Sequence, residues 1–266
     1  MGDAGQVTQN AAEIYDELFP RALFNEWAPR VVELAGVGPG MRVLDVACGT
    51  GVLSLVAADL VKPDGSVAGL DLNPGMLDVA RRKAPHIDWR EAPAEAIPFE
   101  DATFDAVVSQ FGLMFFQDKA LAIREMLRVL RPAGNLAIAV WDSLENVTGY
   151  DAASRLLNRL FGESAAESLR APYSLGDVQK LSSLFSDAGV PDVKITTLEG
   201  TARYPSIRYW MQADIRGWTL ADVLDDAQFE LLVSEAETEL ARFVTNDGKV
   251  EFDNPAHIVT ATKRAG

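Results

Sequence analysis

Several features are scarce in this sequence of 266 residues, and each scarcity excludes a class of protein. Cysteine occurs once, at Cys48, so the chain can form no internal disulfide and no cysteine-based zinc site. There is no uninterrupted apolar run of about 18 residues, so we expect no membrane-spanning helix. There is also no cluster of Lys and Arg, and a net charge of −15 would repel a nucleic-acid backbone. We therefore expect a cytoplasmic protein that binds a small molecule, with no nucleic-acid partner and no metal.

Short apolar strands alternate with helical patterns between residues 40 and 141. Strands are expected at 42–46, 67–70, 87–89, 104–109 and 135–141, and helices at 52–60, 74–83 and 118–130. This alternation is typical of an α/β fold with a Rossmann-like, doubly wound parallel sheet. In such sheets the ligand binds at the carboxyl ends of the strands, where the strand order reverses.

The rest of the chain completes one predicted domain over 1–266. Residues 11–40 read as an N-terminal helical lid in which Pro20 and Pro29 separate short helices. Residues 41–141 form the expected ligand-binding core. Residues 142–255 include a helical substrate cap, together with a helix at 176–188 and a strand at 193–198. Residues 256–266 carry the final strand.

The stretch VLDVACGTG, residues 43–51, joins a buried strand directly to two glycines, Gly49 and Gly51. Glycines let a ligand approach the backbone and let the next helix begin abruptly, although a tight strand-to-helix turn would use them too. Asp45 lies at the end of this strand, where a buried parallel sheet favours apolar residues. A buried carboxylate needs hydrogen-bond or cationic partners, so Asp45 favours the interpretation as a ligand site.

A second carboxylate, Asp71, ends the next strand, 20 residues after Gly51. This placement suits a ribose, because one carboxylate can accept hydrogen bonds from both ribose hydroxyl groups. Asn73-Pro74 after it predicts the N-cap and first residue of a helix. A dinucleotide enzyme would need a third glycine three residues after Gly51, and Ser54 stands there. The loop suits a nucleoside carried without a pyrophosphate.

Four motifs in order resemble those of class I S-adenosylmethionine (SAM) dependent methyltransferases, and among them the ubiquinone/menaquinone-biosynthesis-like (type 11) group. The motifs are VLDVACGTG at 43–51, GLDLNPGML at 69–77, AEAIPF at 94–99 and FDAVVS at 104–109. The resemblance covers roughly 40–141. It implies a seven-stranded sheet whose last strand is antiparallel, and SAM as the cofactor.

The resemblance also implies roles for individual residues. Gly49 and Gly51 would line the methionine part of SAM, with Asp45 near its amino group and the Ala47 backbone beside it. Asp71 would hold the ribose. The remaining expected cofactor contacts are Leu72 on the adenine, Ala94 and Glu95 near the ring, and Ser109 and Gln110 beside the transferred methyl group. Pro93 departs from the family pattern, because relatives commonly carry an adenine-binding carboxylate there.

Aromatic and apolar residues cluster where an acceptor would bind, although core packing is the alternative explanation for each of them. The expected substrate pocket comprises Tyr15, Phe19, Phe111, Met114 and Trp210, with Phe24, Trp27 and Trp218 nearby. No catalytic base stands out. His257 is a weak candidate, and Tyr15, Tyr150, Tyr173 and Asp142 are weaker still.

We therefore expect a SAM-dependent methyltransferase that methylates a small apolar or aromatic acceptor on oxygen or carbon. Two alternatives stay open at this point. One is a SAM-binding regulator that no longer transfers methyl groups, and the other is an NAD-dependent oxidoreductase. The sequence also leaves open whether the chain forms a homodimer.

Overall fold

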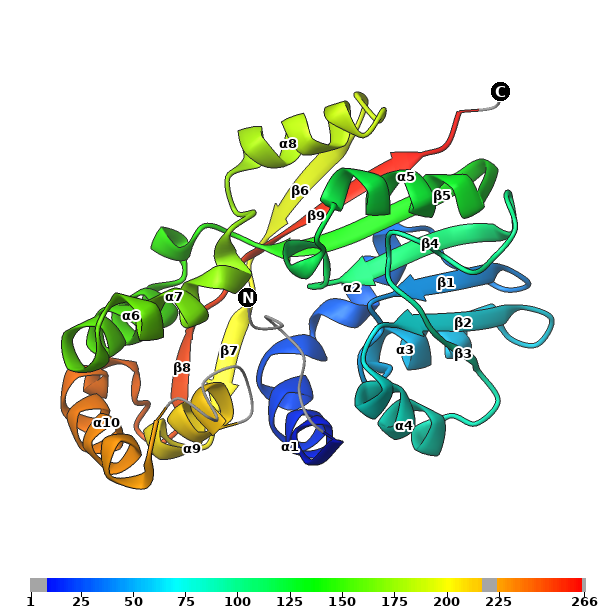
Figure 1. Ribbon diagram of the computed structural model, residues 1–266. Helices are drawn as coiled ribbons and strands as arrows, with labels where there is room; N and C mark the ends of the chain where they lie inside the picture. The colour runs from blue at the N-terminus through cyan, green and yellow to red at the C-terminus, as the bar shows by residue number, and fades with distance from the viewer. Residues whose placement is uncertain (1–8, 217–223, 265–266) are drawn as a thin grey trace.

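A sheet of seven strands in the order β3-β2-β1-β4-β5-β9-β6 forms the centre of the computed structural model, which describes residues 9–216 and 224–264 (Figure 1). The strands are β1 (Arg42–Val46), β2 (Ser66–Asp71), β3 (Asp88–Glu91), β4 (Phe104–Gln110), β5 (Leu130–Trp141), β6 (Lys194–Leu198) and β9 (Ala256–Thr262). Strand β9 runs antiparallel to both β5 and β6, and the strands from β3 to β5 pair in parallel. The predicted α/β sheet with an antiparallel last strand is confirmed.

Helices cover both faces of this sheet, as the right-handed crossovers require. They include α2 (Trp27–Leu34) and α3 (Val52–Val61) on one face, and α5 (Lys119–Val129) and α8 (Val178–Asp187) on the other (Figure 1). Helix α4 (Pro74–Lys83) follows β2, and the Asn73 side chain accepts hydrogen bonds from the backbone N–H groups of Gly75 and Met76. The expected N-cap at Asn73 is therefore formed.

The N-terminal segment bends once and not twice. Helix α1 (Gln9–Phe19) passes into a π-helical turn, Pro20–Phe24, before α2 begins at Trp27. Pro20 thus marks the expected break. Pro29 was expected to make a second break, which is wrong, because it is the third residue of α2. Proline is tolerated in a first helical turn, where the backbone N–H has no partner within the helix.

The cap comes from two separate insertions into the sheet domain. The first holds α6 (Thr148–Phe161), α7 (Glu163–Arg170) and a 3₁₀ turn, Ala171–Tyr173. The second holds β7 (Thr201–Tyr204), α9 (Ile207–Met211), a π-helix, Gln212–Arg216, α10 (Asp226–Glu239) and β8 (Val250–Asp253). Helix α8 and strand β6, which lie between them in sequence, pack with the main sheet (Figure 1).

A two-stranded ribbon joins the cap to the sheet. Strand β7 follows β6 after Glu199–Gly200, β8 precedes β9 by two residues, and β7 pairs antiparallel with β8 (Figure 1). The Asn254 N–H donates to the Gly200 carbonyl at 2.8 Å where the strands change sheets. No helix in residues 9–216 or 224–264 is long and apolar enough to cross a membrane.

Trp89 of β3 packs against two glycines, which explains why each lacks a side chain. A Cβ at Gly69 would lie 2.3 Å from the Trp89 ring, and a Cβ at Gly51 would lie 2.8 Å from it. The Trp89 Nε1 also donates to the Ala84 carbonyl at 2.8 Å, which fixes the ring. Gly69 in β2 is therefore a packing requirement.

We expect Gly69→Ala to lower the free energy of unfolding by about 1–3 kcal/mol, because the added methyl group overpacks a fixed indole. Urea denaturation of the purified protein measures this change. The control is Gly38→Ala, whose added Cβ would meet no atom within 4 Å. Equal unfolding midpoints for the two variants would contradict the packing role.

Candidate functional site

Asp45, next to last in β1, is a fully buried carboxylate with one unsatisfied oxygen. Its Oδ2 accepts a hydrogen bond from the Ser54 hydroxyl of α3 at 2.6 Å, and its Oδ1 has no partner. Burial raises the pKa of Asp45 to about 7, although the Ser54 hydrogen bond opposes the rise. Such a group favours a donor or a cation in the space that it lines.

That space is a cavity at the carboxyl ends of β1 and β4, where the order of the parallel strands reverses. It is lined by Tyr15, Phe24, Asp45, Ala47, Cys48, Gly49, Thr50, Val52, Leu53 and Gln110. We call it the glycine-loop cavity. Of the residues expected to bind the cofactor, it contains Asp45, Ala47, Gly49 and Gln110. Tyr15 was expected to contact the acceptor, but it lines this cavity.

The two glycines of the loop have different surroundings. Gly49 has φ +53°, and a Cβ there would meet no atom within 4 Å, so the loop leaves open space at that point. Gly51 has φ +87° and precedes α3, and its bare side faces Trp89. The cavity lining includes Gly49 but not Gly51. Gly51 is thus explained by the turn and by packing, and the expectation that it lines the cofactor gains no support.

Asp71, at the end of β2, holds the glycine loop in place. Its Oδ2 accepts from the Gly49 N–H at 2.8 Å, and its Oδ1 accepts from the Asn73 N–H at 2.8 Å. A carboxylate offers about four lone-pair positions, so each oxygen can still accept a second donor. Asp71 is half-buried and therefore open to a ligand with two hydroxyl groups.

Three other expected cofactor residues lie outside the cavity lining. Leu72, directly after Asp71, is 48% exposed. Ala94 is buried, while the Glu95 Oε1 accepts from the backbone N–H groups of Gln117 and Asp118. Glu95 thus anchors the start of α5, which leaves its expected role near an adenine without support.

The ends of β1 and β4 turn sharply beside each other. Ala47 and Phe111 both adopt left-handed backbone conformations, with φ of 58° and 56°, which cost about 1–2 kcal/mol each in residues other than glycine. A Cβ at Gly112 would lie 2.5 Å from the Ala47 Cβ, so the two turns touch. Four polar atoms near these turns are buried without hydrogen-bond partners: Asp45 Oδ1, Thr50 Oγ1, Ser109 Oγ and Gln110 Oε1.

These features fit the cofactor that the sequence resemblance implies. The unsatisfied Asp45 oxygen suits an ammonium group, and the open side of Gly49 leaves room for a chain against the backbone. Asp71 offers acceptor positions for a diol, and exposed Leu72 offers an apolar surface for a base. The residues of this edge could therefore hold SAM.

A second cavity lies between the N-terminal segment and the cap, and we call it the apolar cavity. It is lined by Phe19, Leu23, Phe24, Trp141, Tyr150, Ser168, Leu169, Pro172, Tyr173 and Asp214. Phe24 lines both cavities, so the two cavities lie next to each other. The Gln110 Nε2 donates to the Phe24 carbonyl at 3.3 Å, which ties this wall to the end of β4.

Of the five residues expected to form the substrate pocket, only Phe19 lines the apolar cavity, and Phe24, which was expected nearby, lines it too. Phe111 lies behind it, stacked on Trp141 with ring centroids 3.5 Å apart. Trp210 is fully buried among Tyr150, Tyr204 and Phe252 in the cap core. Met114 is buried outside the lining. Core packing explains these three residues, and Trp218 lies outside the described residues.

A network of polar side chains reaches the apolar cavity from the cap. The Tyr150 hydroxyl donates to Asp214 Oδ1 at 3.2 Å and lies 2.5 Å from the Tyr204 hydroxyl. Sequence reasoning named Tyr150 and Tyr173 as weak candidates but missed Asp214. The one available signal was the position of this carboxylate among apolar residues. It was not recognised because many exposed acidic residues follow it in the cap.

His257 does not reach either cavity. Its Nε2 lies 2.9 Å from the Gly176 carbonyl and 3.0 Å from Asp142 Oδ1, and its Nδ1 lies 2.9 Å from the Thr197 hydroxyl. Both ring nitrogens are therefore engaged within the protein, and the side chain is 2% exposed. His257 connects β9, β6 and the end of β5, which is a structural role. Asp142 is part of the same contact.

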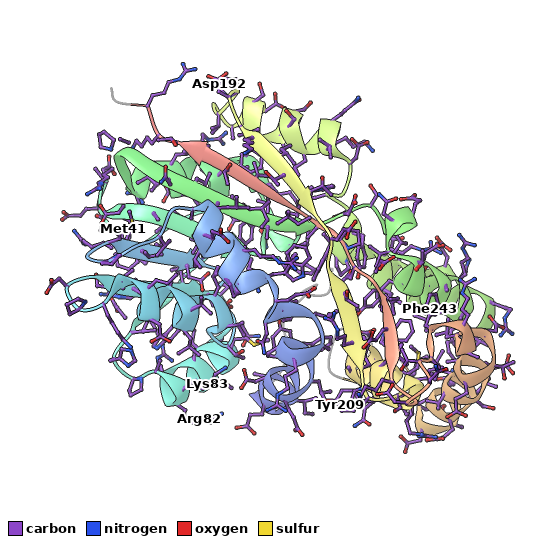
Figure 2. All side chains as sticks on the ribbon, turned by 180° about the vertical axis from the view of Figure 1, so that it is seen from behind. Met41, Arg82, Lys83, Asp192, Tyr209 and Phe243 are labelled. Atoms are coloured by element: carbon purple, nitrogen blue, oxygen red, sulfur yellow. The ribbon has the colours of Figure 1, made fainter. Side chains whose placement is uncertain are left out.

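Helix α1 closes the glycine-loop cavity from outside. Arg82 of α4 pairs with Glu13, and Lys83 pairs with Asp16, each at 2.7 Å. Figure 2 shows both basic residues on the side of α4 that faces α1. Tyr15 of α1 stacks on Phe24, with centroids 5.7 Å apart. The lid is thus held by exposed ion pairs at one edge and by aromatic contacts at the other.

The sequence matches the family described as methyltransferase domain over residues 43–134. The chain is 34% identical to a demethylmenaquinone methyltransferase of Listeria welshimeri over an alignment of 193 residues. This alignment covers 66% of this chain and 81% of the relative. The chain is 32% identical to the ubiquinone/menaquinone biosynthesis C-methyltransferase UbiE of Cronobacter sakazakii, over 73% of this chain and 85% of the relative. The UbiE of Saccharophagus degradans is 38% identical, but the match spans only 56% of that relative.

Solved structures share the fold at low sequence identity. A phosphoethanolamine N-methyltransferase 2 of Haemonchus contortus, in complex with S-adenosylhomocysteine, superposes with a TM-score of 0.62 at 18% identity. That likeness covers 97% of this chain and 58% of the other. The [4+2]-cyclase SpnF superposes with a TM-score of 0.56 at 20% identity, over 99% of this chain and 98% of the cyclase. These likenesses show the fold alone.

Two methyltransferase relatives are aligned over 81% and 85% of their length, and the edge of the sheet suits SAM. The NAD-dependent alternative is therefore left without support. The chain belongs to the class I SAM-dependent methyltransferases of the ubiquinone/menaquinone-biosynthesis (UbiE-like) type.

Proposed function

We propose that this enzyme methylates a small, flat, apolar or aromatic acceptor on oxygen or carbon, and that the acceptor binds in the apolar cavity. The observation that supports this most strongly is the position of Phe24, which lines both cavities. A molecule in each cavity would contact this same residue, which brings the cofactor and the acceptor close together. The relatives named as C-methyltransferases of ubiquinone/menaquinone biosynthesis support an aromatic acceptor.

On the cofactor side, Asp45 would accept from the amino group of SAM, Gly49 would let its chain lie against the backbone, and Asp71 would accept from the ribose hydroxyls. Leu72 would cover one face of the adenine, and Ser109 and Gln110 would lie near the methyl group. Bound SAM supplies an activated methyl group. The protein therefore has mainly to align the acceptor and exclude water, which suits a cavity lined by Phe19, Trp141 and Tyr173.

We further propose that the enzyme works in the cytoplasm on a free small molecule. The one cysteine, Cys48, is buried, which fits a reducing compartment. The net charge of −15 argues against a nucleic-acid partner. Whether two copies associate stays a prediction, which analytical ultracentrifugation would test.

The two loop glycines should respond differently to an added methyl group. We expect Gly49→Ala to weaken S-adenosylhomocysteine binding by about tenfold or more, equivalent to about 1.4 kcal/mol, because the added methyl group enters the open space of the glycine-loop cavity. Gly51→Ala should mainly lower the melting temperature, because its methyl group meets Trp89. Calorimetric titration and thermal unfolding of both variants check this division. Identical effects of the two substitutions would refute it.

Asp45 predicts a pH-dependent cofactor affinity. Its pKa of about 7 in the free protein means that the carboxyl group is largely protonated at pH 6. An ammonium ligand favours the ionised form, so binding releases a proton and tightens as the pH rises from 6 to 8. Asp45→Asn should weaken S-adenosylhomocysteine binding by about 10–100-fold and remove this dependence. Titration calorimetry at pH 6, 7 and 8 measures both effects.

The control for that experiment is Asp64→Asn, an exposed carboxylate in the turn before β2. It should keep both the affinity and the pH dependence of the unmodified enzyme. A pH-independent affinity in the unmodified enzyme would mean that Asp45 does not contact the amino group.

The acceptor class is tested with SAM that carries a labelled methyl group. We expect transfer to naphthols or reduced naphthoquinones, and little or no transfer to hydroxynaphthalene sulfonates of similar size, because the apolar cavity offers no cation to pair with a sulfonate within the described residues. Mass spectrometry of the product distinguishes oxygen from carbon methylation. Preferential methylation of the sulfonates would overturn the proposed acceptor.

A further inference from the structure

We propose that Asp214 determines acceptor specificity by accepting a hydrogen bond, through its Oδ2, from a hydroxyl group on the molecule in the apolar cavity. The inference rests on the proposed function, because it assumes that the acceptor binds in this cavity. It goes further in requiring that the otherwise apolar acceptor carries a hydroxyl group at the end that enters the cap.

The first argument is the unsatisfied oxygen. Asp214 lies in the π-helix Gln212–Arg216, is 7% exposed and lines the apolar cavity. Its Oδ1 accepts from the Tyr150 hydroxyl, but its Oδ2 has no hydrogen-bond partner. The Trp210 indole also favours the ionised carboxylate, yet its Nε1 forms no well-aligned hydrogen bond. A buried polar atom without a partner costs about 1–3 kcal/mol, so a donor in the cavity would recover this energy.

The second argument is the setting of the carboxylate. The residues that line the cavity around Asp214 are aromatic, aliphatic or hydroxyl-bearing, and none of those described carries a positive charge. Among the side chains described, those of residues 12–215 and 224–264, no ion pair involves Asp214. A charged group that stabilised only the fold would be expected to have a partner there. The groups that stabilise the Asp214 carboxylate are both neutral: the Trp210 indole, and the Tyr150 hydroxyl, whose side chain lines the same cavity.

The third argument favours a neutral hydroxyl over a cationic amine. Burial raises the pKa of Asp214 to about 7, so near neutral pH the group alternates between a carboxylate and a neutral acid. Both forms accept a hydrogen bond from a hydroxyl, whereas an ammonium group needs the carboxylate. SAM is itself a cation, and it would bind on the other side of Phe24. A second cation in the apolar cavity would be repelled by it.

The neighbouring titratable groups remain neutral donors. Tyr150 on α6, Tyr173 on the 3₁₀ turn and Tyr204 on β7 surround the carboxylate, and burial raises the pKa of each phenol. These phenols therefore keep their protons between pH 6 and 8. Among these cap residues around the apolar cavity, Asp214 is therefore the one that titrates over that range, and the Asp214 variants separate its effect from that of Asp45 in the other cavity.

The test compares two probes that differ in one donor. Calorimetry measures binding of 2-naphthol and of 2-methoxynaphthalene to the enzyme saturated with S-adenosylhomocysteine. We expect the naphthol to bind about tenfold more tightly, as one hydrogen bond to a charged acceptor predicts. Asp214→Leu should remove the preference. Glu251→Gln, at an exposed site of the same cap, should keep it.

The pH dependence of the preference for naphthol is a second readout, and it does not depend on the apolar variant Asp214→Leu. In the unmodified enzyme the preference for naphthol should grow from pH 6 to pH 8, because the ionised carboxylate is the stronger acceptor. Asp214→Asn should retain a smaller preference without this growth. Equal binding of the two probes at every pH would overturn the inference while leaving the proposed function intact. Failure of both probes to bind, with S-adenosylhomocysteine bound normally, would overturn the proposed acceptor class and this inference with it.

Discussion

The rest of this structure depends on two carboxylates, those of Asp45 and Asp71, which lie at the carboxyl ends of apolar strands. Asp45 is fully buried in β1, an inner strand of the sheet, and Ser54 of α3 stabilises its carboxylate by donating to one oxygen. Asp71 in the next strand then fixes the glycine loop through the Gly49 N–H. The loop cannot move without breaking a contact to a buried or half-buried carboxylate. A rigid, partly unsatisfied edge of this kind is prepared for a charged ligand before the ligand arrives.

The same edge is closed by segments that lie far away in the sequence. Helix α1 reaches over it to pair with α4, and the ribbon of β7 and β8 carries the cap to the other side of Phe24 (Figure 1). Exposed ion pairs such as Glu13–Arg82 contribute little to stability, about 0–1 kcal/mol. A lid held by such pairs can open at low energetic cost.

The sequence predicted the parts of this molecule that depend on local patterns. The strands from β1 to β5, the N-cap at Asn73 and the polar residues of the glycine-loop cavity follow from short motifs, because each is specified by neighbours within about ten residues. The acceptor cavity could not be predicted in this way. Its lining joins Phe19, Trp141, Tyr173 and Asp214, which only the fold brings together. Aromatic and apolar residues were expected there, but Trp210 and Met114 are buried in the core, since one sequence does not distinguish a core side chain from one that lines a cavity.

Specificity in this family member should therefore lie in the insertions and not in the sheet. The matched domain ends at residue 134, before either part of the cap begins, while Tyr150 and Asp214 belong to one insertion each. The likeness to a protein named as a cyclase, over nearly all of both chains, shows that the fold alone does not determine a reaction. A π-helix that presents one carboxylate to an apolar cavity is a local feature that can vary without disturbing β1 or the glycine loop. The cofactor edge and the acceptor cavity can thus change separately, although they share Phe24 and the contact between Tyr15 and Phe19.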